Sequence, residues 1–230
     1  MKTDKMKYIF ILWWVIGVQT VGAQDNRLII TLEDFKELKG FDGLSINLIK
    51  ATENKAVITG DNVDKVVIVN NDGVLKIRMQ IRKIFSGYKT FVDIYYKSKL
   101  VIIDVNEDAL IRSEDEITQD ILELKAQEGG EIRIKAAVEQ MMVKSITGGV
   151  IKAVGFARLQ DVKINTGGVY EGKEFKTKFT TINVNAGSRA EAYASDYVKV
   201  SVKAGGEVLL YGNPAKVDER KVFGGIIKRM

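Results

Sequence analysis

Residues 146–206 read ITGGVIKAVGFARLQDVKINTGGVYEGKEFKTKFTTINVNAGSRAEAYASDYVKVSVKAGG. Within this stretch, pairs of small residues return every 18 to 20 residues, and the same interval continues on both sides of it. A repeat of this period is typical of a solenoid, in which each unit stacks on the one before it. The six pairs are Gly129-Gly130, Gly148-Gly149, Gly167-Gly168, Gly187-Ser188, Gly205-Gly206 and Gly224-Gly225.

The residues before each pair alternate between apolar and polar side chains, which indicates a strand with one buried face. We interpret each unit as strand, glycine corner, strand, turn and strand, since glycine adopts positive φ without steric cost. The sequence therefore predicts an all-β, single-stranded, right-handed parallel β-helix (β-solenoid) of triangular section, with rungs of about 19 residues. The apolar positions five and three residues before the pairs include Leu124, Val143, Val162, Ile182 and Val200, then Ala126, Ile164, Val184 and Val202.

A sandwich of β-hairpins is the alternative fold. Each 19-residue unit would then be one hairpin, with Gly-Gly or Asn-Ala-Gly as its turn. The parallel coil is favoured because the same positions recur from unit to unit, which parallel stacking requires and a meander does not.

The N-terminal half is less regular, and we expect it to cap the coil and cover its open edge. Residues 70–73, Asn-Asn-Asp-Gly, read as a hairpin turn, and Ile84–Thr90 reads as a loop. Thr31–Leu38 is expected to form a short helix, and Asp104–Ser113 a degenerate rung with Glu107-Asp108 in place of glycines. Strands are expected at Gly43–Lys50, Ala56–Thr59, Val66–Val69, Val74–Ile81, Phe91–Tyr96 and Leu100–Val105.

The first residues are typical of a secretory signal peptide. Three lysines precede a short apolar run, Tyr8–Val18, and Val21-Gly22-Ala23 fits a cleavage site. We expect cleavage after Ala23 and one domain over residues 24–230, irregular over 24–120 and regular over 121–230. A membrane anchor is the alternative, although the run is short for the roughly 20 residues that a bilayer requires. The expected location is exported: periplasmic, outer-surface or extracellular, with no later membrane-spanning segment.

Composition excludes several classes of function. Among 230 residues there is no His and no Cys, which excludes His-dependent triads, thiolate chemistry, disulfides and zinc fingers. The net charge of +5 is too small to indicate a nucleic-acid-binding protein. The sequence predicts no cofactor and no metal site.

The chain also resembles a known family. Phe41-Asp42-Gly43-Leu44 leads into an expected strand, Gly60-Asp61-Asn62 precedes the hairpin, and the corners NTGG, NAGS and KAGG are followed by Val208–Pro214. These features, from about Phe35 to Gly225, are similar to those of the autotransporter adhesin, head GIN domain family of exported bacterial proteins. The resemblance implies a β-helix-like fold and an extracytoplasmic location, and it supplies no catalytic residues. The departures at Gly187-Ser188 and Glu107-Asp108 are where irregular rungs are expected.

A row of lysines is the first candidate site. Lys125, Lys144 and Lys163 each stand four residues before a small-residue pair, so a coil stacks them about 4.8 Å apart on its outer face. The row reads as a surface for an anionic polymer or, alternatively, as an ordinary solvated face. Two positions further along the chain, the candidate surface includes Asn165, Asn185 and Lys203.

Three other groups complete the candidates. Tyr193 and Tyr211 should stack on neighbouring rungs, as a sugar-binding or merely stiffening ladder. The acidic residues Glu107, Asp108, Glu114, Asp115, Glu116 and Asp120 match no calcium-binding spacing and read as a charged loop or a turn of helix. Asp161, Lys163 and Arg189 are residue types that polysaccharide-cleaving β-helices use, but nothing in their spacing singles them out.

The sequence therefore favours an exported, non-enzymatic binding or structural module of the cell envelope, with a glycan or a cell-surface protein as its partner. A polysaccharide-acting enzyme, lyase or hydrolase, on the same scaffold is the alternative.

Overall fold

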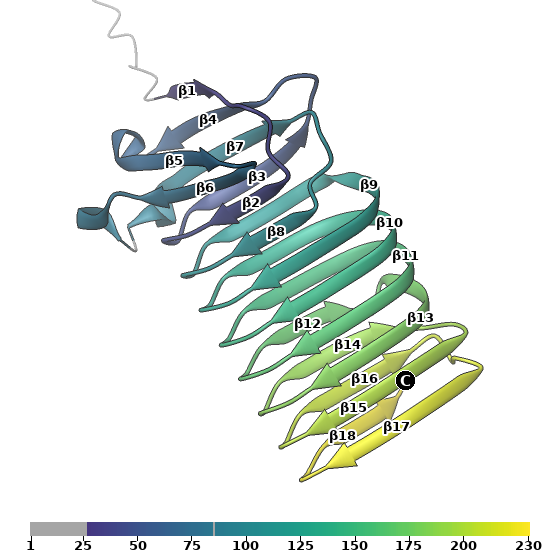
Figure 1. Ribbon diagram of the computed structural model, residues 1–230. Coiled ribbons are helices and arrows are strands. Elements are labelled where there is room, and N and C mark those ends of the chain that lie inside the picture. The colour runs from purple at the N-terminus through teal and green to yellow at the C-terminus, as the bar shows by residue number, and fades with distance from the viewer. Residues whose placement is uncertain (1–26, 85) are drawn as a thin grey trace, which may run out of the picture.

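The computed structural model describes residues 27–84 and 86–230, so the expected signal peptide, residues 1–23, lies outside the described residues. The chain forms a right-handed β-solenoid whose rungs stack in parallel and in register (Figure 1). Residue Glu131 pairs with Val150, which confirms the predicted rung of about 19 residues. Within the described residues, no helix is long and apolar enough to cross a membrane.

The rungs build two sheets that face each other across the core. Sheet A contains the strands that run into the corners, whose arrowheads lie along the lower left edge of Figure 1. In spatial order it consists of β5 (Val66–Asn71), β6 (Val74–Met79), β2 (Glu37–Gly40), β8 (Ile102–Val105), the C-terminal halves of β9 (Leu110–Ala126), β10 (Glu131–Ser145) and β11 (Val150–Ile164), then β13 (Phe175–Val184), β15 (Tyr197–Lys203) and β17 (Lys216–Val222).

Sheet B contains the strands that leave the corners. It begins with two antiparallel pairings, β1 with β4 and β4 with β7, and continues in parallel. In spatial order it consists of β1 (Leu28–Thr31), β4 (Lys55–Gly60), β7 (Thr90–Tyr96), β3 (Ser45–Lys50), the N-terminal halves of β9, β10 and β11, then β12 (Val169–Gly172), β14 (Arg189–Tyr193), β16 (Glu207–Tyr211) and β18 (Ile226–Arg229).

The two sheets are continuous with each other at one side of each of the rungs of β9, β10 and β11. At the side opposite the corners, β9, β10 and β11 bend and continue as single strands of 15 to 17 residues. Small residues allow the bend, because Gly155 has φ 127° and a side chain there would collide with the Ala136 backbone. We call this side of the molecule the bend.

The glycine pairs meet two different steric requirements. In each corner the residue before the pair and the first glycine are left-handed, as at Thr166 (φ 51°) and Gly167 (φ 71°). The second glycine is needed for space instead, because a Cβ on Gly168 would lie 2.5 Å from the Ser145 carbonyl oxygen of the preceding rung. The corners at 107–108 and 186–187 keep the same two left-handed residues. The rung that follows 107–108 is irregular as expected, because its register with the next rung shifts between Ile134 and Lys135.

These requirements predict different costs for two neighbouring substitutions. Gly167→Ala places a Cβ in open space and should cost only the left-handed strain, about 1–2 kcal/mol. Gly168→Ala forces two backbones apart and should cost about 3 kcal/mol, the upper end for overpacking a core. Urea unfolding of both variants measures the difference, and equal costs would contradict a steric role for the second glycine.

The acidic segment is part of a strand. Glu114 and Asp115 form a bulge in β9, where the register with β10 shifts between Ile134 and Lys135. The Lys50 backbone N–H donates to the Asp115 carboxylate, and Lys99 pairs with Asp120. The expected loop or helical turn is therefore wrong for residues 114–120, because hydrogen bonds to β10 hold most of this stretch extended. Glu107 and Asp108, by contrast, lie in a corner turn before β9, as a loop would.

The N-terminal part caps the coil as expected, but its strands are not stacked in chain order. The hairpin β5–β6, turning at Asp72-Gly73, and the antiparallel strands β1 and β4 lie at the far end. Strand β2 inserts between β6 and β8, and these partners hold Glu37–Gly40 extended, so the helix expected at Thr31–Leu38 is absent. The helices of the described chain are short 3-10 turns at Val63–Lys65, Ile81–Lys83 and Gly87–Lys89.

The opposite end of the core is covered by charged side chains. In the rung of β17 and β18, Glu219, Lys221 and Arg229 pair in register with the buried residues Val200, Val202 and Leu210 of the previous rung. Arg229 Nη2 lies 2.7 Å from Glu219 Oε1, and Lys221 Nζ lies 3.7 Å from Glu219 Oε2. Ion pairs therefore occupy positions that are apolar in the interior rungs.

Candidate functional site

Register places the predicted lysines side by side. Lys125 pairs with Lys144 and Lys144 with Lys163 on adjacent strands of sheet A, next to the corners. Their chain neighbours, such as Val143 and Val162 one residue earlier, are buried, so the lysines face outward as predicted. The same row continues through Asn183 and Ser201.

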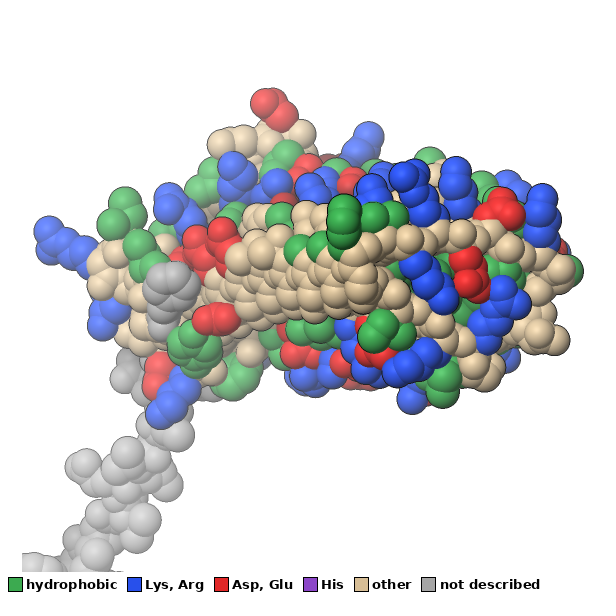
Figure 2. Space-filling model, turned by 90° about the horizontal axis from the view of Figure 1, so that it is seen from below, with side chains coloured by type: hydrophobic (Ala, Val, Ile, Leu, Met, Phe, Trp, Pro, Cys, Tyr) green, Lys and Arg blue, Asp and Glu red, His purple; other side chains and the backbone are tan. Residues whose placement is uncertain are grey.

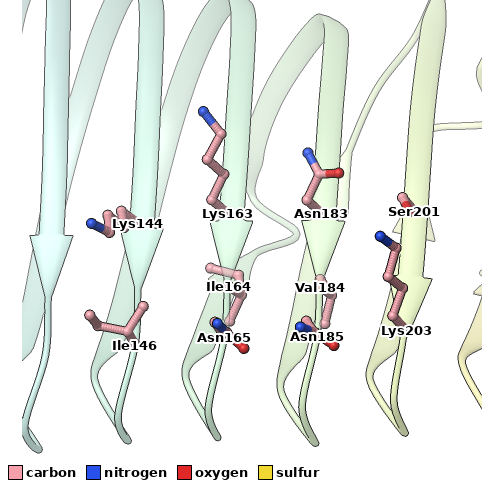
Figure 3. A pocket seen from close by; sticks show the side chains of 10 residues that line it. All are labelled: Lys144, Ile146, Lys163, Ile164, Asn165, Asn183, Val184, Asn185, Ser201 and Lys203. Atoms are coloured by element: carbon pink, nitrogen blue, oxygen red, sulfur yellow. The ribbon is translucent and has the colours of Figure 1, made fainter.

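A second row lies two residues further along each strand, where the strand enters its corner. Asn165, Asn185 and Lys203 occupy this row, as the repeat predicts, and Ile146 precedes them. Figure 3 shows Lys144 and Lys163 reaching out from the strands, with Asn165 and Asn185 at corresponding places beside the corners. The Asn165 Oδ1 accepts the Thr166 backbone N–H, which holds this side chain against its corner.

The two rows enclose a groove of about 300 Å³, to which the core residues Ile164 and Val184 also contribute. A smaller groove of about 200 Å³, lined by Lys125 and Gln127, shares Lys144 and Ile146 with it. The hollow surface therefore extends over several rungs along the solenoid axis. We call the surface formed by Lys125, Lys144, Lys163, Asn165, Asn185 and Lys203 the corner groove.

Positive charge is only partly neutralised in the corner groove. Lys163 Nζ lies 2.8 Å from Asp161 Oδ2, and Lys125 Nζ lies 3.2 Å from Glu123 Oε2. Hydrogen bonding and charge attraction from Asp161 raise the pKa of Lys163. In the described part of the chain, no carboxylate lies within 4.0 Å of Lys144 or Lys203, where Met142 and Ser201 stand two residues earlier. The corner groove thus carries an excess of cations.

Sheet B shows the opposite pattern. Arg189 lies 2.9 Å from Glu191 and 3.0 Å from Glu207, and Lys152 lies between Glu131 and Glu171 at 3.5 and 3.4 Å. Figure 2 shows basic side chains along both sides of a band of backbone and uncharged side chains, consistent with the stacked corners. At these positions of sheet B the cations are matched by carboxylates, whereas Lys144 and Lys203 of the corner groove are not matched among the described residues.

The two candidate tyrosines lie elsewhere. Tyr193 and Tyr211 are neighbours in register, as predicted, but they belong to sheet B and are half-buried at the bend end of its strands. The structure therefore does not bring them together with the lysines.

The residues considered for catalysis are also separated. Asp161 and Lys163 lie on sheet A, whereas Arg189 lies on sheet B and is bound by its own carboxylates. Within residues 27–84 and 86–230, no group of three acidic side chains is placed to hold a metal ion.

A third row on sheet A was not proposed from the sequence as a site. It lies at the bend end of the strands, eight residues before each small-residue pair, and two of its members, Ile121 and Phe179, are exposed and apolar. The repeat itself could have revealed this row. Its members stand an odd number of residues from the buried positions, and side chains an odd number of residues apart on a strand point to opposite faces. The row consists of Ile121, Gln140, Leu159, Phe179 and Tyr197.

A family model described as "Putative auto-transporter adhesin, head GIN domain" matches residues 34–214. The chain belongs to this family. The resemblance noted in the corners and the N-terminal hairpin is thereby confirmed, and the head GIN domain match covers both the irregular cap and most of the regular rungs. No functionally curated protein matches the chain.

Solved structures of other proteins show the same fold. A protein described as a putative adhesin from Bacteroides fragilis superposes with a TM-score of 0.81 at 17% identity, covering 89% of this chain and 96% of that one. A second so described, from Parabacteroides distasonis, gives 0.70 at 18% identity with the same coverage. A protein from Parabacteroides distasonis described as a putative lipid binding protein gives 0.66 at 16%, covering 88% and 95%. At these identities the likeness concerns the fold alone.

Proposed function

We propose that this head GIN domain protein is an exported, non-enzymatic binding module of the cell envelope, and that its corner groove binds an acidic polymer such as an acidic glycan. The observation that carries the proposal is the in-register row of Lys125, Lys144 and Lys163, which opens onto a groove. The family's adhesin description supports a role at the cell surface.

The periodicity of the groove supports a polymer over a small anion. Adjacent rungs present their side chains about 4.8 Å apart, so an extended chain with repeated negative groups meets one cation after another. Like charges at this spacing repel each other unless solvent or an anion lies between them. Lys144 and Lys203 have no carboxylate partner among the described residues, so an anionic ligand would neutralise the charge of these two lysines most.

The amide side chains add uncharged contacts. Asn165 and Asn185 line the same groove as Lys144 and Lys163, and an amide can donate and accept hydrogen bonds. An acidic glycan offers hydroxyl groups as well as carboxylates or sulfates, so it uses both rows. We therefore favour an acidic glycan over a simple polyanion as the ligand.

The lysine row can be tested by a triple substitution. Changing Lys125, Lys144 and Lys163 together to Gln should reduce binding to acidic glycans at least about tenfold, while the fold stays intact because these positions face outward. Binding by the wild type should weaken steeply as salt rises, since exposed charges are screened over about 8 Å at physiological ionic strength. A glycan array read at low and high salt measures both effects.

A matched control separates the row from the net charge. Lys173, Lys176 and Lys178 are exposed lysines outside the corner groove, so changing all three to Gln removes the same charge elsewhere. This control should keep its binding. Equal loss in both triple variants would mean that only net charge matters, and no binding of any acidic glycan by the wild type would leave the row as a solvated face.

A further inference from the structure

A second groove lies on sheet A at the bend end of the same strands. Its volume is about 480 Å³, larger than that of either of the two hollows of the corner groove. We call the surface formed by Gln140, Arg158, Leu159, Asp161, Phe179 and Tyr197 the bend groove. It spans four adjacent strands, β10, β11, β13 and β15, and lies about four residues, roughly 13 Å, from the lysine row along each strand.

One part of the bend groove is an apolar and aromatic ladder. Leu159 pairs in register with Phe179, and Phe179 with Tyr197, so the three side chains stand on consecutive rungs of one outer face. Phe179 is 38% exposed. Tyr197 is held in place because its hydroxyl donates to Asp218 Oδ2 at 2.6 Å and Lys216 Nζ lies 5.7 Å from its ring centre. The ladder is therefore a preformed surface on which a flat apolar face can stack.

Hydrogen-bonding groups border this ladder. Asp161 Oδ2 binds Lys163, but Asp161 Oδ1 is buried and has no hydrogen-bond partner among the described residues. A buried acceptor without a donor costs free energy that a ligand hydroxyl would recover. Gln140, on the neighbouring strand, supplies both a donor and an acceptor.

Charge distinguishes the bend groove from the corner groove. Arg158 is paired with Glu139, and Asp161 is paired with Lys163, so the charged groups of the bend groove are matched within the protein. A ligand with a net charge gains little there. The chemistry that fits is a neutral group with an apolar face and hydroxyls at its edge.

We propose that the bend groove binds a neutral pyranose unit of a glycan. The C–H face of the sugar ring stacks on Phe179, beside Tyr197, and its hydroxyl groups hydrogen-bond with Asp161 Oδ1 and Gln140. Because the ladder repeats along the axis, consecutive sugar units of one chain meet consecutive rungs. This site adjoins the corner groove through the Asp161–Lys163 ion pair, but it does not rest on the acidic-polymer function proposed for that groove.

Binding of neutral oligosaccharides to the full chain tests the proposal. A neutral glycan array identifies a ligand, and saturation-transfer NMR measures its affinity for each variant. Phe179→Ala should weaken binding about tenfold through loss of ring stacking, and Asp161→Asn should weaken it through loss of the acceptor. Phe91→Ala is the matched control, because Phe91 is 49% exposed on sheet B and should bind as the wild type does.

The outcomes separate the two grooves. Neutral-glycan binding that is insensitive to salt, lost in Phe179→Ala and kept in the double variant Lys125→Gln, Lys144→Gln supports the bend groove, because this double variant keeps the Asp161–Lys163 ion pair. Binding that is lost in the double variant and kept in Phe179→Ala belongs to the corner groove and overturns the proposal. Failure of every neutral glycan to bind, with circular dichroism showing a folded protein, also overturns it.

Discussion

Val162→Asp should unfold the protein at temperatures where the wild type is stable, at a cost of about 4 kcal/mol or more. Val162 is fully buried between Val143 and Ile182 of the adjacent rungs, and no cationic side chain is among these in-register neighbours. A carboxylate there is an unpaired charge in the core. Thermal and urea unfolding followed by circular dichroism measure the loss.

Lys163→Asp, at the next residue, is the control. Lys163 is exposed on the outer face, so the same new side chain should change the free energy of unfolding by about 0.5 kcal/mol or less. The contrast between two adjacent positions tests the assignment of inner and outer faces. Similar losses in the two variants would show that the assignment is wrong.

Removing the charges that cover the C-terminal end of the core should make the protein associate end to end. Within residues 27–84 and 86–230, β17 pairs only with β15 and β18 only with β16, so the outer edges of both strands carry backbone donors and acceptors that no described strand uses. Inward-pointing charges are a known protection for such edges. In the triple variant Glu219→Val, Lys221→Val and Arg229→Leu, an apolar core end and a free edge are presented together.

Sedimentation velocity at several protein concentrations measures this effect. The triple variant should sediment as a dimer or a larger species at concentrations where the wild type does not. Substitution of three charges on the outer face, Lys199, Lys203 and Glu207, by Gln is the control and should leave sedimentation unchanged. If the core-end variant sediments like the wild type, the ion pairs around Glu219 do not prevent association.

The regular half of the fold could be predicted from the sequence because the interval between corners alone determines which residues of adjacent rungs lie side by side. A fixed interval between corners places Lys125 above Lys144 and Lys144 above Lys163 without knowledge of any other contact. The interval does not say how many sheets the rung forms. That depends on whether residues such as Ala136 and Gly155 let one strand bend through, which only the packing of neighbouring rungs decides.

The N-terminal half is harder to predict from the sequence because its strands do not pair in chain order. Strand β2 lies between β6 and β8, which come 37 and 65 residues later in register, and no local pattern encodes these partners. The helix predicted at Thr31–Leu38 is absent for this reason, since long-range hydrogen bonds between strands override the local conformational preference of the sequence. The hairpin at Asp72-Gly73 was predicted because its turn is local.

The sequence predicts which candidate residues stack in one row, but it does not predict which rows lie on the same sheet. Periodicity places Asn165 beside Asn185 and Tyr193 beside Tyr211, and register confirms the tyrosine pair. It does not show that the tyrosines lie on the other sheet, nor that Lys163 has a carboxylate partner and Lys144 has none among the described residues. These differences depend on side-chain neighbours across rungs.

The stacking of rungs has a mechanical consequence. The described chain begins at one end of the solenoid and finishes at the other, and the hydrogen bonds between rungs run along the line that joins these ends (Figure 1). A tensile load applied through the two ends therefore pulls rungs apart one at a time, as a zipper opens, and does not shear many strands at once. Each rung that peels away releases about 19 residues, roughly 65 Å of extended chain. Under such a load the solenoid is therefore expected to lengthen in steps of one rung.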